Sequence, residues 1–190
     1  MSQIVIVSGP PGAGKSSVCD LLCERYDRTI HLVTDDAYAW IRMGYIPPWK
    51  PGSMHQNMMV SRAAARAATA FAQEQYGVFV DGVIGPIHLP VYIEEMARAG
   101  VPIHYAVLLP PVAETMRRAR ARAEFDNRAA AEFERQAQDG DMFARVHAMF
   151  ADAAPLPGWS LDNSDMTAEQ AADAVMEACG RGDALVWPPA

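Results

Sequence analysis

Residues 9–16, Gly-Pro-Pro-Gly-Ala-Gly-Lys-Ser, decide the fold because they match the pattern G-x-x-x-x-G-K-[ST] in the context that this pattern requires. The apolar, β-branched run at residues 4–7 comes directly before them and predicts a strand buried on both faces. A helix is predicted from about Gly14, since apolar residues recur there at helical spacing. In such a strand, turn and helix, the backbone N–H groups turn inward around phosphate oxygens. The sequence therefore predicts a phosphate-binding loop.

The residues of this loop have distinct predicted roles. Lys15 supplies a mobile positive charge for the β- and γ-phosphates, and the Ser16 hydroxyl is a ligand for Mg²⁺. The alternative is a Gly/Pro-rich connector that matches by chance, which the flanking strand and helix disfavour. The residues expected to bind the nucleotide here are Gly9, Gly12, Ala13, Gly14, Lys15, Ser16 and Ser17.

The composition indicates one ordinary globular domain. The chain has 190 residues, of which 51% are hydrophobic and 21% charged, and a formal net charge of -7. This acidic balance argues against a general attraction to nucleic acid or to anionic membranes. Three cysteines without paired spacing indicate neither a disulfide scaffold nor a zinc site, and no stretch reaches the length of a membrane span. We expect a single domain over residues 1–190, in the cytoplasm, acting as a monomer or homodimer.

Strands and helices alternate along the chain. The strands are predicted at residues 4–7, 30–33, 78–81, 103–109 and, weakly, 159–161. This alternation predicts an α/β fold with a parallel sheet covered by helices on both faces. The sequence after Gly180 has no assigned element, although Trp187 is expected either to be loosely held or to pack on a neighbour.

Several helix ends have recognisable signals. Ser53 and Gln56 form the pattern of a capping box for a long helix that runs to Tyr76. Thr167 and Gln170 form the same pattern before the last helix. Between these two, a helix that starts at Pro90 is expected to carry a Glu94–Arg98 pair and to stop at Gly100.

Acidic residues follow two of the predicted strands. Asp35 and Asp36 lie after the second strand, at the edge where ligands bind in open α/β sheets. One of them is expected to accept the proton of an acceptor hydroxyl, and the other to orient the substrate or hold metal through water; the alternative is a helix N-cap. Asp81 ends the third strand and is expected to hold Mg²⁺ or to contact the acceptor, unless it only begins an Asp-Gly turn.

Arginines cluster between residues 117 and 145, interleaved with acidic residues. Most are expected on a solvated helix face. Arg118 and Arg122, however, are four apart on one face, at the start of a helical region at residues 117–150, and Arg128 follows a break in it. We expect this region to be a lid, because phosphoryl transfer requires exclusion of water and an arginine that stabilises transition-state charge.

Residues 40–56 are rich in aromatic residues and proline and are expected to bind the acceptor. The segment offers an aromatic wall, one cation and several hydrogen-bonding groups. A solvated Arg42 and tryptophans used in ordinary packing are the alternatives. The expected substrate-binding residues are Trp40, Arg42, Trp49, Gln56 and Asn57, together with Asp36 and Asp81.

Taken together, these motifs resemble the P-loop small-molecule kinases of the nucleoside-monophosphate-kinase-like group, nearest to the zeta-toxin and chloramphenicol-phosphotransferase-like branch of AAA-type P-loop kinases. The resemblance covers most of the chain. It implies a P-loop NTPase fold, a three-layer α/β/α sandwich with a helical lid and a five-stranded parallel sheet in the order 2-3-1-4-5. It also implies that Asp35 rather than Asp36 is the base, that Arg118 lies on the adenine and Arg122 on phosphates, and that the segment containing Asn163 approaches the base.

We therefore expect an ATP- and Mg²⁺-dependent phosphotransferase that moves the γ-phosphoryl group to a hydroxyl of a small metabolite or antibiotic-like molecule. Lys15, Asp35 and Arg122 are the expected catalytic residues. A nucleotide or nucleoside kinase, in which the aromatic segment stacks a base, stays open as an alternative. A nucleotide-dependent switch or binding module, with slow turnover and a protein partner, is an alternative of another class. The doubled Asp and the lid arginines favour catalysis over switching.

Overall fold

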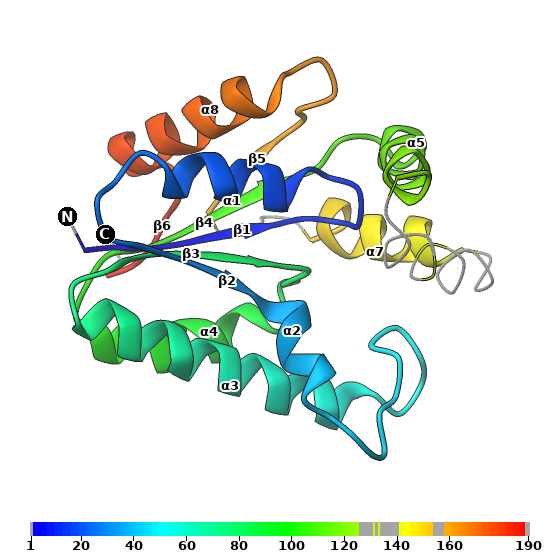
Figure 1. Ribbon diagram of the computed structural model, residues 1–190, viewed down its shortest axis with the longest axis horizontal. Helices are drawn as coiled ribbons and strands as arrows, with labels where there is room; N and C mark the ends of the chain where they lie inside the picture. Colours follow the sequence, from blue (N-terminus) through cyan, green and yellow to red (C-terminus); the bar gives the residue numbers. More distant parts are fainter. Residues whose placement is uncertain (1, 126–130, 132, 134–140, 154–157, 189–190) are drawn as a thin grey trace.

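One twisted sheet organises the molecule (Figure 1). The computed structural model describes residues 2–125, 131, 133, 141–153 and 158–188. The sheet has the order β2-β3-β1-β4-β5, all parallel, and a sixth strand pairs with β4. Its strands are β1 (Ile4–Ser8), β2 (Thr29–Val33), β3 (Gly77–Gly82), β4 (Ile103–Leu108), β5 (Trp159–Leu161) and β6 (Leu185–Trp187). The predicted fold class and strand order are confirmed.

The sixth strand is the one part of the sheet that the sequence prediction missed. β6 runs antiparallel to β4, with Ile103 opposite Trp187 and His104 opposite Leu185. A three-residue strand is too short to show a period of its own. The prediction of a five-stranded sheet is therefore corrected to six strands, with Trp187 paired through its backbone at the edge of the sheet.

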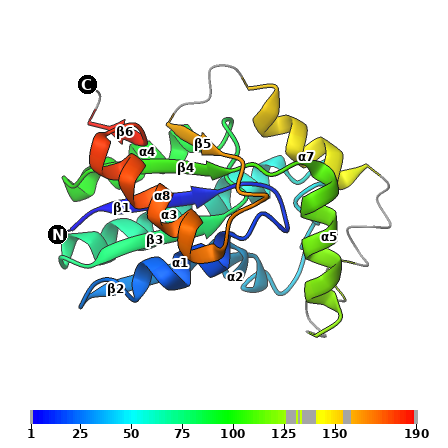
Figure 2. The same ribbon diagram turned by 90° about the horizontal axis from the view of Figure 1, so that it is seen from above.

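Helices cover both faces of the sheet, as Figures 1 and 2 show. Helices α1 and α8 lie against one face, and α3 and α4 against the other. None of the helices within the described ranges combines the length and the apolar character needed to span a bilayer. The helices are α1 (Lys15–Cys23), α2 (Thr34–Ala39), α3 (Met54–Gln73), α4 (Leu89–Met96), α5 (Val112–Ala123), α7 (Met142–Ala151) and α8 (Ala168–Arg181), and a 3₁₀ turn, η1 (Ala97–Ala99), follows α4.

Strand β1 is apolar from Ile4 to Val7 because it supplies both cores. All five of its residues are buried. Ile4 and Ile6 pack into the cluster on the side of α3 and α4, whereas Val5 and Val7 pack into the cluster on the side of α1 and α8. Successive side chains of a strand point to opposite faces, so a central strand covered on both sides has no polar face.

The register of the strands brings the predicted site residues to one edge. Asp81 on β3 lies opposite Val7 on β1 and opposite Val33 on β2. The phosphate loop that follows β1 and the first turn of α2 therefore start at the same level as Asp81. In Figure 2, α5 and α7 lie beyond this carboxyl edge.

Two of the helix-end predictions are wrong and one is confirmed. Thr167 and Gln170 form a complete capping box at α8. Ser53 does precede α3, but its side chain makes no cap hydrogen bond and donates instead to the Pro48 carbonyl at 2.7 Å. Helix α3 ends at Gln73, three residues before the predicted end.

The predicted Glu94–Arg98 pair is replaced by a different contact. Nη1 of Arg98 lies 2.9 Å from the carboxylate of Glu95, which is buried and also meets Arg66 at 3.1 Å and Arg62 at 3.6 Å. Glu94 is exposed. Arg98 therefore pairs with Glu95 rather than with Glu94. The attraction between a guanidinium group and a carboxylate is stronger for the buried Glu95 than for a carboxylate surrounded by water.

The region predicted as a lid is only partly free of the core. Helix α5 stands at the edge of the sheet, while α7 is packed against the rest of the molecule through Phe150, which is fully buried, and through Met149, which contacts Gly85. Movement of α7 together with α5 would therefore expose core residues such as Phe150, and a lid at residues 117–150 stays a prediction. Arg128 lies outside the described residues.

Candidate active site at the carboxyl edge of the sheet

The phosphate loop has the backbone that its glycines allow. Gly9, Gly12 and Gly14 have φ values of 139°, 82° and 93°, in the region that side chains disfavour. A Cβ at Gly12 would overlap the Thr115 carbonyl of α5, and a Cβ at Gly9 would overlap the Leu108 carbonyl. The loop is thus in direct backbone contact with the first turn of α5, which only glycine permits.

Lys15 lies at the first turn of α1, behind this loop. Its Nζ donates a hydrogen bond of 3.1 Å to the Pro10 carbonyl, so the ammonium group is folded over the loop. The Ala13 N–H also bonds to the Pro10 carbonyl, at 3.2 Å. This arrangement places a positive charge and the N-terminal end of a helix on the same side of the loop, which suits an anionic phosphate chain.

Ser16 and Asp81 meet at the edge of the sheet. The Ser16 hydroxyl donates to Oδ2 of Asp81 at 2.6 Å, and Asp81 is only 3% exposed. Burial raises the pKa of Asp81. His31, Lys15 and the hydrogen bond from Ser16 lower this pKa by a larger amount, so the net shift is downward. An ionised carboxylate beside a hydroxyl is a fitting oxygen donor set for Mg²⁺. Their assignment as metal ligands stays a prediction.

His31 is a residue of this site that the sequence analysis did not identify. Its Nδ1 lies 2.8 Å from the Asp20 carboxylate on α1, and its Nε2 lies 3.6 Å from Oδ2 of Asp81. Asp81 raises the pKa of His31, Asp20 adds to this effect, and burial partly opposes it. No spacing in the sequence could have indicated this cluster, because its members come from α1, β2 and β3.

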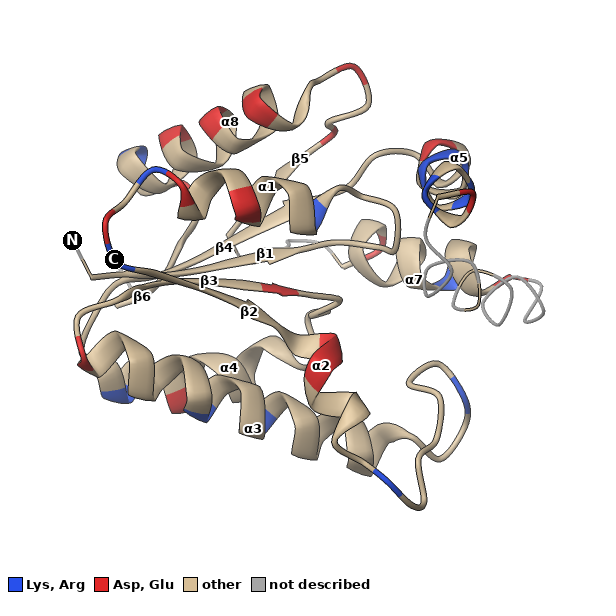
Figure 3. Ribbon diagram, viewed as in Figure 1, with Lys and Arg blue, Asp and Glu red and all other residues tan. Residues whose placement is uncertain are grey.

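Asp35 and Asp36 both lie in the first turn of α2 and are exposed. The N-cap of this helix is Val33, with no side-chain cap hydrogen bond, so the alternative of an Asp as N-cap is wrong. Thr34, the first residue of the helix, packs on Gly82, where a Cβ would overlap the Thr34 hydroxyl. Figure 3 shows the acidic start of α2 at the same end of the sheet as the acidic position on β3 and the basic start of α1.

Asn163 and Arg118 form one wall beside the phosphate loop. The Asn163 Nδ2 donates to the Ala13 carbonyl at 3.0 Å, and Nη2 of Arg118 donates to the carbonyls of Asn163 and Ser164, both at 2.9 Å. With Gly14, they line a hollow of about 370 Å³. Its place beside the loop is where the resemblance implies a nucleotide base.

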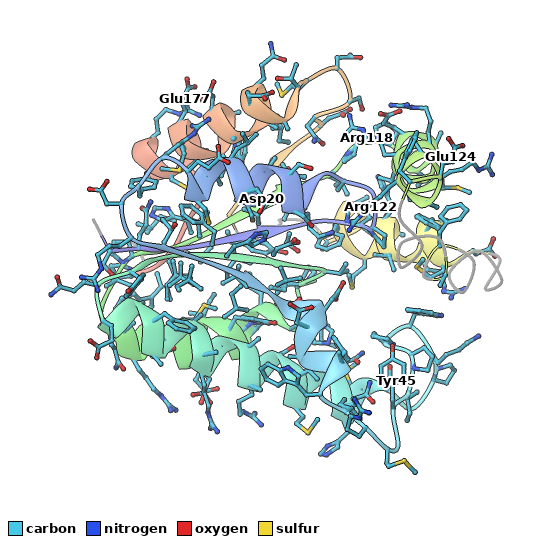
Figure 4. All side chains as sticks on the ribbon, viewed as in Figure 1. Asp20, Tyr45, Arg118, Arg122, Glu124 and Glu177 are labelled. Atoms are coloured by element: carbon cyan, nitrogen blue, oxygen red, sulfur yellow. The ribbon has the colours of Figure 1, made fainter. Side chains whose placement is uncertain are left out.

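Arg122 lies one helical turn after Arg118, near the end of α5, and is exposed. In Figure 4 both arginines lie on the side of α5 toward the phosphate loop, whereas Glu124 lies on the far side. The structure thus brings Arg118 to the hollow beside Gly14 and places Arg122 further out along the same face. Its contact with phosphates stays a prediction.

The segment at residues 40–56 is held by the polar side chains that were expected to bind substrate. Gln56 accepts from the Ile46 N–H at 2.9 Å and donates to the Ile46 carbonyl at 2.6 Å. Asn57 donates to the Pro48 carbonyl at 2.8 Å and accepts from Tyr38 at 3.2 Å. Both residues are buried, so here their polar groups fix the loop rather than face an acceptor.

The other expected acceptor-binding residues of this segment are more open. Trp40 is 69% exposed and Arg42 is exposed, while Trp49 is half-buried. They lie on a segment that continues from α2 and therefore from Asp35. Their role in acceptor binding stays a prediction.

Comparison with known proteins agrees with this geometry. A family described as an AAA domain matches residues 4–140, which include the phosphate loop, α2, Asp81 and α5. The chain belongs to this family. No curated protein matches the sequence of this AAA domain protein.

Solved structures share the fold of this AAA domain protein at low sequence identity. A sugar kinase from Janibacter sp. HTCC2649 has a TM-score of 0.71 at 13% identity, with 95% of each chain covered. The APS kinase of Mycobacterium tuberculosis in complex with AMPPNP and APS has a TM-score of 0.62 at 19% identity, covering 94% of this chain and 98% of that one. The tunicamycin resistance protein of Deinococcus radiodurans has a TM-score of 0.62 at 17% identity, with all of both chains covered. The fold is that of the P-loop kinases of small molecules.

Proposed function

We propose that the protein is an ATP- and Mg²⁺-dependent phosphotransferase that moves the γ-phosphoryl group of ATP to a hydroxyl of a small molecule. The supporting observation is that the phosphate loop with Lys15, the Ser16–Asp81 pair and the exposed Asp35 lie at one edge of the sheet. A switch needs only the first two features, whereas a phosphotransferase also needs a group that can accept the proton of the acceptor hydroxyl. The membership in the AAA domain family and the kinases of similar fold support the same class of reaction.

The residues of this edge divide the chemistry of a direct in-line transfer among them. Backbone N–H groups of the loop and the Lys15 ammonium bind and orient the phosphate chain. Asp35 accepts the proton of the attacking hydroxyl, and Asp36 orients the acceptor. Arg122 offsets charge that develops on the transferring group. No covalent intermediate with the protein is required.

Mg²⁺ would be held by the Ser16 hydroxyl and the Asp81 carboxylate. When bound, it offsets negative charge on the phosphates. The structure supports these two ligands because Asp81 is buried, keeps a lowered pKa and already contacts Ser16. The role of the protein is to keep this carboxylate ionised and fixed in place.

The acceptor is proposed to be a small hydroxyl compound, a metabolite or an antibiotic-like molecule. The segment that continues from Asp35 presents Trp40 with 69% of its surface exposed, and an exposed indole at the end of the helix that carries the proposed base suits a ring-bearing ligand. We also propose that the enzyme acts in the cytoplasm as a monomer or homodimer and needs no nucleic acid or membrane partner.

A screen of hydroxyl compounds tests the proposal. Thermal shifts are recorded with a non-hydrolysable ATP analogue, and compounds that raise the melting temperature are incubated with ATP and analysed for a product heavier by one phosphate. The Lys15→Ala variant serves as the control and should form no product. If nucleosides or nucleotides alone are phosphorylated, the enzyme is a nucleoside or nucleotide kinase. ATP hydrolysis that depends on a protein partner, with no acceptor found, would overturn the proposal in favour of a switch.

A further inference from the structure

The guanidinium group of Arg118 is held from more than one side. Its Nε donates to Oε1 of Glu114 at 2.6 Å, and its Nη2 donates to the carbonyls of Asn163 and Ser164. The N–H groups of a guanidinium lie in one plane, so these three bonds fix the plane of the group. The side chain is 22% exposed and lines the hollow beside Gly14. Arg118 is thus prepared as one rigid wall of the base site.

Glu114 is the one side chain among the three partners that fix this plane. Its Oε1 is shared between Arg118 and Nη2 of Arg117, and its Oε2 accepts from Nε of Arg117 at 2.7 Å. The hydrogen bonds from Arg117 and Arg118 lower the pKa of Glu114 to about 2. The carboxylate is therefore ionised at neutral pH. It is an anchor that stays charged, with 19% of its surface exposed.

The same helix turn also supports the phosphate side of the site. The Thr115 carbonyl, next to Glu114, is the group that Gly12 packs against, and Asn163 donates to the Ala13 carbonyl. Glu114 and the phosphate loop therefore meet at the start of α5 without a direct bond between them. A change at Glu114 can loosen Arg118 while the contact between Gly12 and Thr115 remains.

We propose that Glu114 is a positioning residue that holds the Arg118 guanidinium flat against the base of the nucleotide. Glu114 accordingly contributes to the affinity for a nucleoside triphosphate and hardly at all to the affinity for a polyphosphate without a base. Arg117 is the outer partner that orients the carboxylate, since its side chain is 68% exposed. The inference rests on the proposed function, because it takes the hollow as the place of the base of ATP.

Binding measurements separate the base from the phosphates. Dissociation constants of ATP and of inorganic tripolyphosphate, each with Mg²⁺, are measured by calorimetry for wild type, Glu114→Ala and Glu114→Gln. We expect Glu114→Ala to weaken ATP binding about tenfold and tripolyphosphate binding less than twofold, as for the loss of one charged hydrogen bond. Glu114→Gln should weaken ATP binding about threefold. Glu114→Gln keeps the shape of the side chain, so its dissociation constants test the proposal if the alanine variant does not fold.

A double-mutant cycle tests whether Glu114 acts through Arg118. In an Arg118→Lys background the ammonium cannot span the three partners, so the further change Glu114→Gln should have no additional effect on ATP binding. The matched control is Glu124→Ala, which removes an exposed carboxylate from the far side of the same helix and should change neither constant. Additive effects of the two changes would show that Glu114 does not act through Arg118.

The failures of the two proposals are distinguishable. If Glu114→Ala weakens ATP and tripolyphosphate equally, or weakens neither, while wild type binds both ligands, the positioning role of Glu114 is overturned and the proposed function stands. If wild type binds neither ligand, the proposed function itself fails.

Discussion

The Ser16 hydroxyl donates a 2.6 Å hydrogen bond to Oδ2 of Asp81, which lies 65 positions later in the chain. This bond joins the start of α1 to the end of β3. Because Asp81 is 3% exposed and its pKa is lowered, an ionised carboxylate is kept in a largely enclosed place. An uncompensated charge there would be costly, so the polar contacts around Asp81 are part of what stabilises this edge of the sheet.

Replacing this carboxylate should strongly lower turnover while sparing nucleotide binding by the loop. Asp81→Asn keeps the volume and an acceptor for Ser16 but removes the charge. We expect kcat to fall at least about 100-fold and the Mg²⁺ concentration for half-maximal activity to rise. Steady-state kinetics at varied Mg²⁺ measure both. Asp20→Asn is the matched control, since it removes a carboxylate that also contacts His31 but not Ser16. Unchanged Mg²⁺ dependence would exclude Asp81 from the metal site.

The contact between the phosphate loop and α5 predicts that Gly12 cannot be replaced. Gly12→Ala combines a positive φ of 82° with overlap on the Thr115 carbonyl. We expect unfolding free energy to fall by about 2–4 kcal/mol and ATP binding to be lost. Gly44→Ala separates the two causes, because Gly44 has a φ of 76° and open space around it. It should cost about 1 kcal/mol in urea denaturation and leave ATP binding intact. Equal losses in the two variants would mean that the contact with α5 contributes nothing.

The parts of the site that could be predicted from the sequence are those built from neighbours in the chain. The strand at residues 4–8, the phosphate loop and the start of α1 form one continuous stretch of sequence. The motif in this stretch predicts its backbone conformation directly. Asp35 and Asp81 could be placed because carboxyl ends of parallel strands share an edge. The capping box at Thr167 was predicted correctly for the same reason, since both of its partners are local.

The contacts that the prediction missed join distant residues. Asn163 meets Ala13 across 150 positions, and His31 meets Asp81 between two strands. Ser53 and Gln56 have the local pattern of a capping box. Instead of capping the helix, however, Gln56 bonds to the backbone of Ile46 and Ser53 bonds to the Pro48 carbonyl. Local spacing cannot reveal such competition, because it depends on which loop the fold brings close.

The two carboxylates of α2 should differ in kinetic effect. If Asp35 is the base, Asp35→Asn lowers kcat by about 10²–10⁴-fold with little change in the dissociation constant of ATP. Asp36→Asn should mainly raise the KM of the acceptor. Steady-state kinetics and ATP calorimetry on both variants check this. A larger loss of kcat in Asp36→Asn would reverse the assignment. A loss of ATP affinity with kcat unchanged would make Asp35 a binding residue instead.

The raised pKa of His31 predicts a pH-dependent contribution to stability. A raised folded-state pKa stabilises the fold fully below the unfolded-state value of about 6.5, and the effect is lost as pH rises through the folded-state pKa. His31→Asn should therefore cost more unfolding free energy at pH 5.5 than at pH 8.5, by a few tenths to about 1 kcal/mol. Asp81, with a lowered pKa, stays ionised across this window.

Urea denaturation at both pH values measures this difference in the absence of nucleotide. His55→Asn is the control, because His55 is exposed on α3. A cost of His31→Asn that is the same at both pH values would show that His31 contributes only by packing.

The last prediction concerns the loop that carries Trp40 and Trp49. Gln56 satisfies both backbone groups of Ile46 from a buried position, so Gln56→Ala leaves an N–H and a carbonyl without these partners. We expect a loss of about 1–3 kcal/mol in unfolding free energy. If the loop binds the acceptor, the KM of the acceptor should rise severalfold while the KM of ATP stays unchanged, since no ATP-binding residue touches this loop in the proposed arrangement. Gln73→Ala on the same helix is the control, because Gln73 is exposed and its side chain donates to the Arg98 carbonyl at 3.3 Å, away from the loop. An unchanged acceptor KM in a destabilised Gln56→Ala variant would separate the loop from acceptor binding.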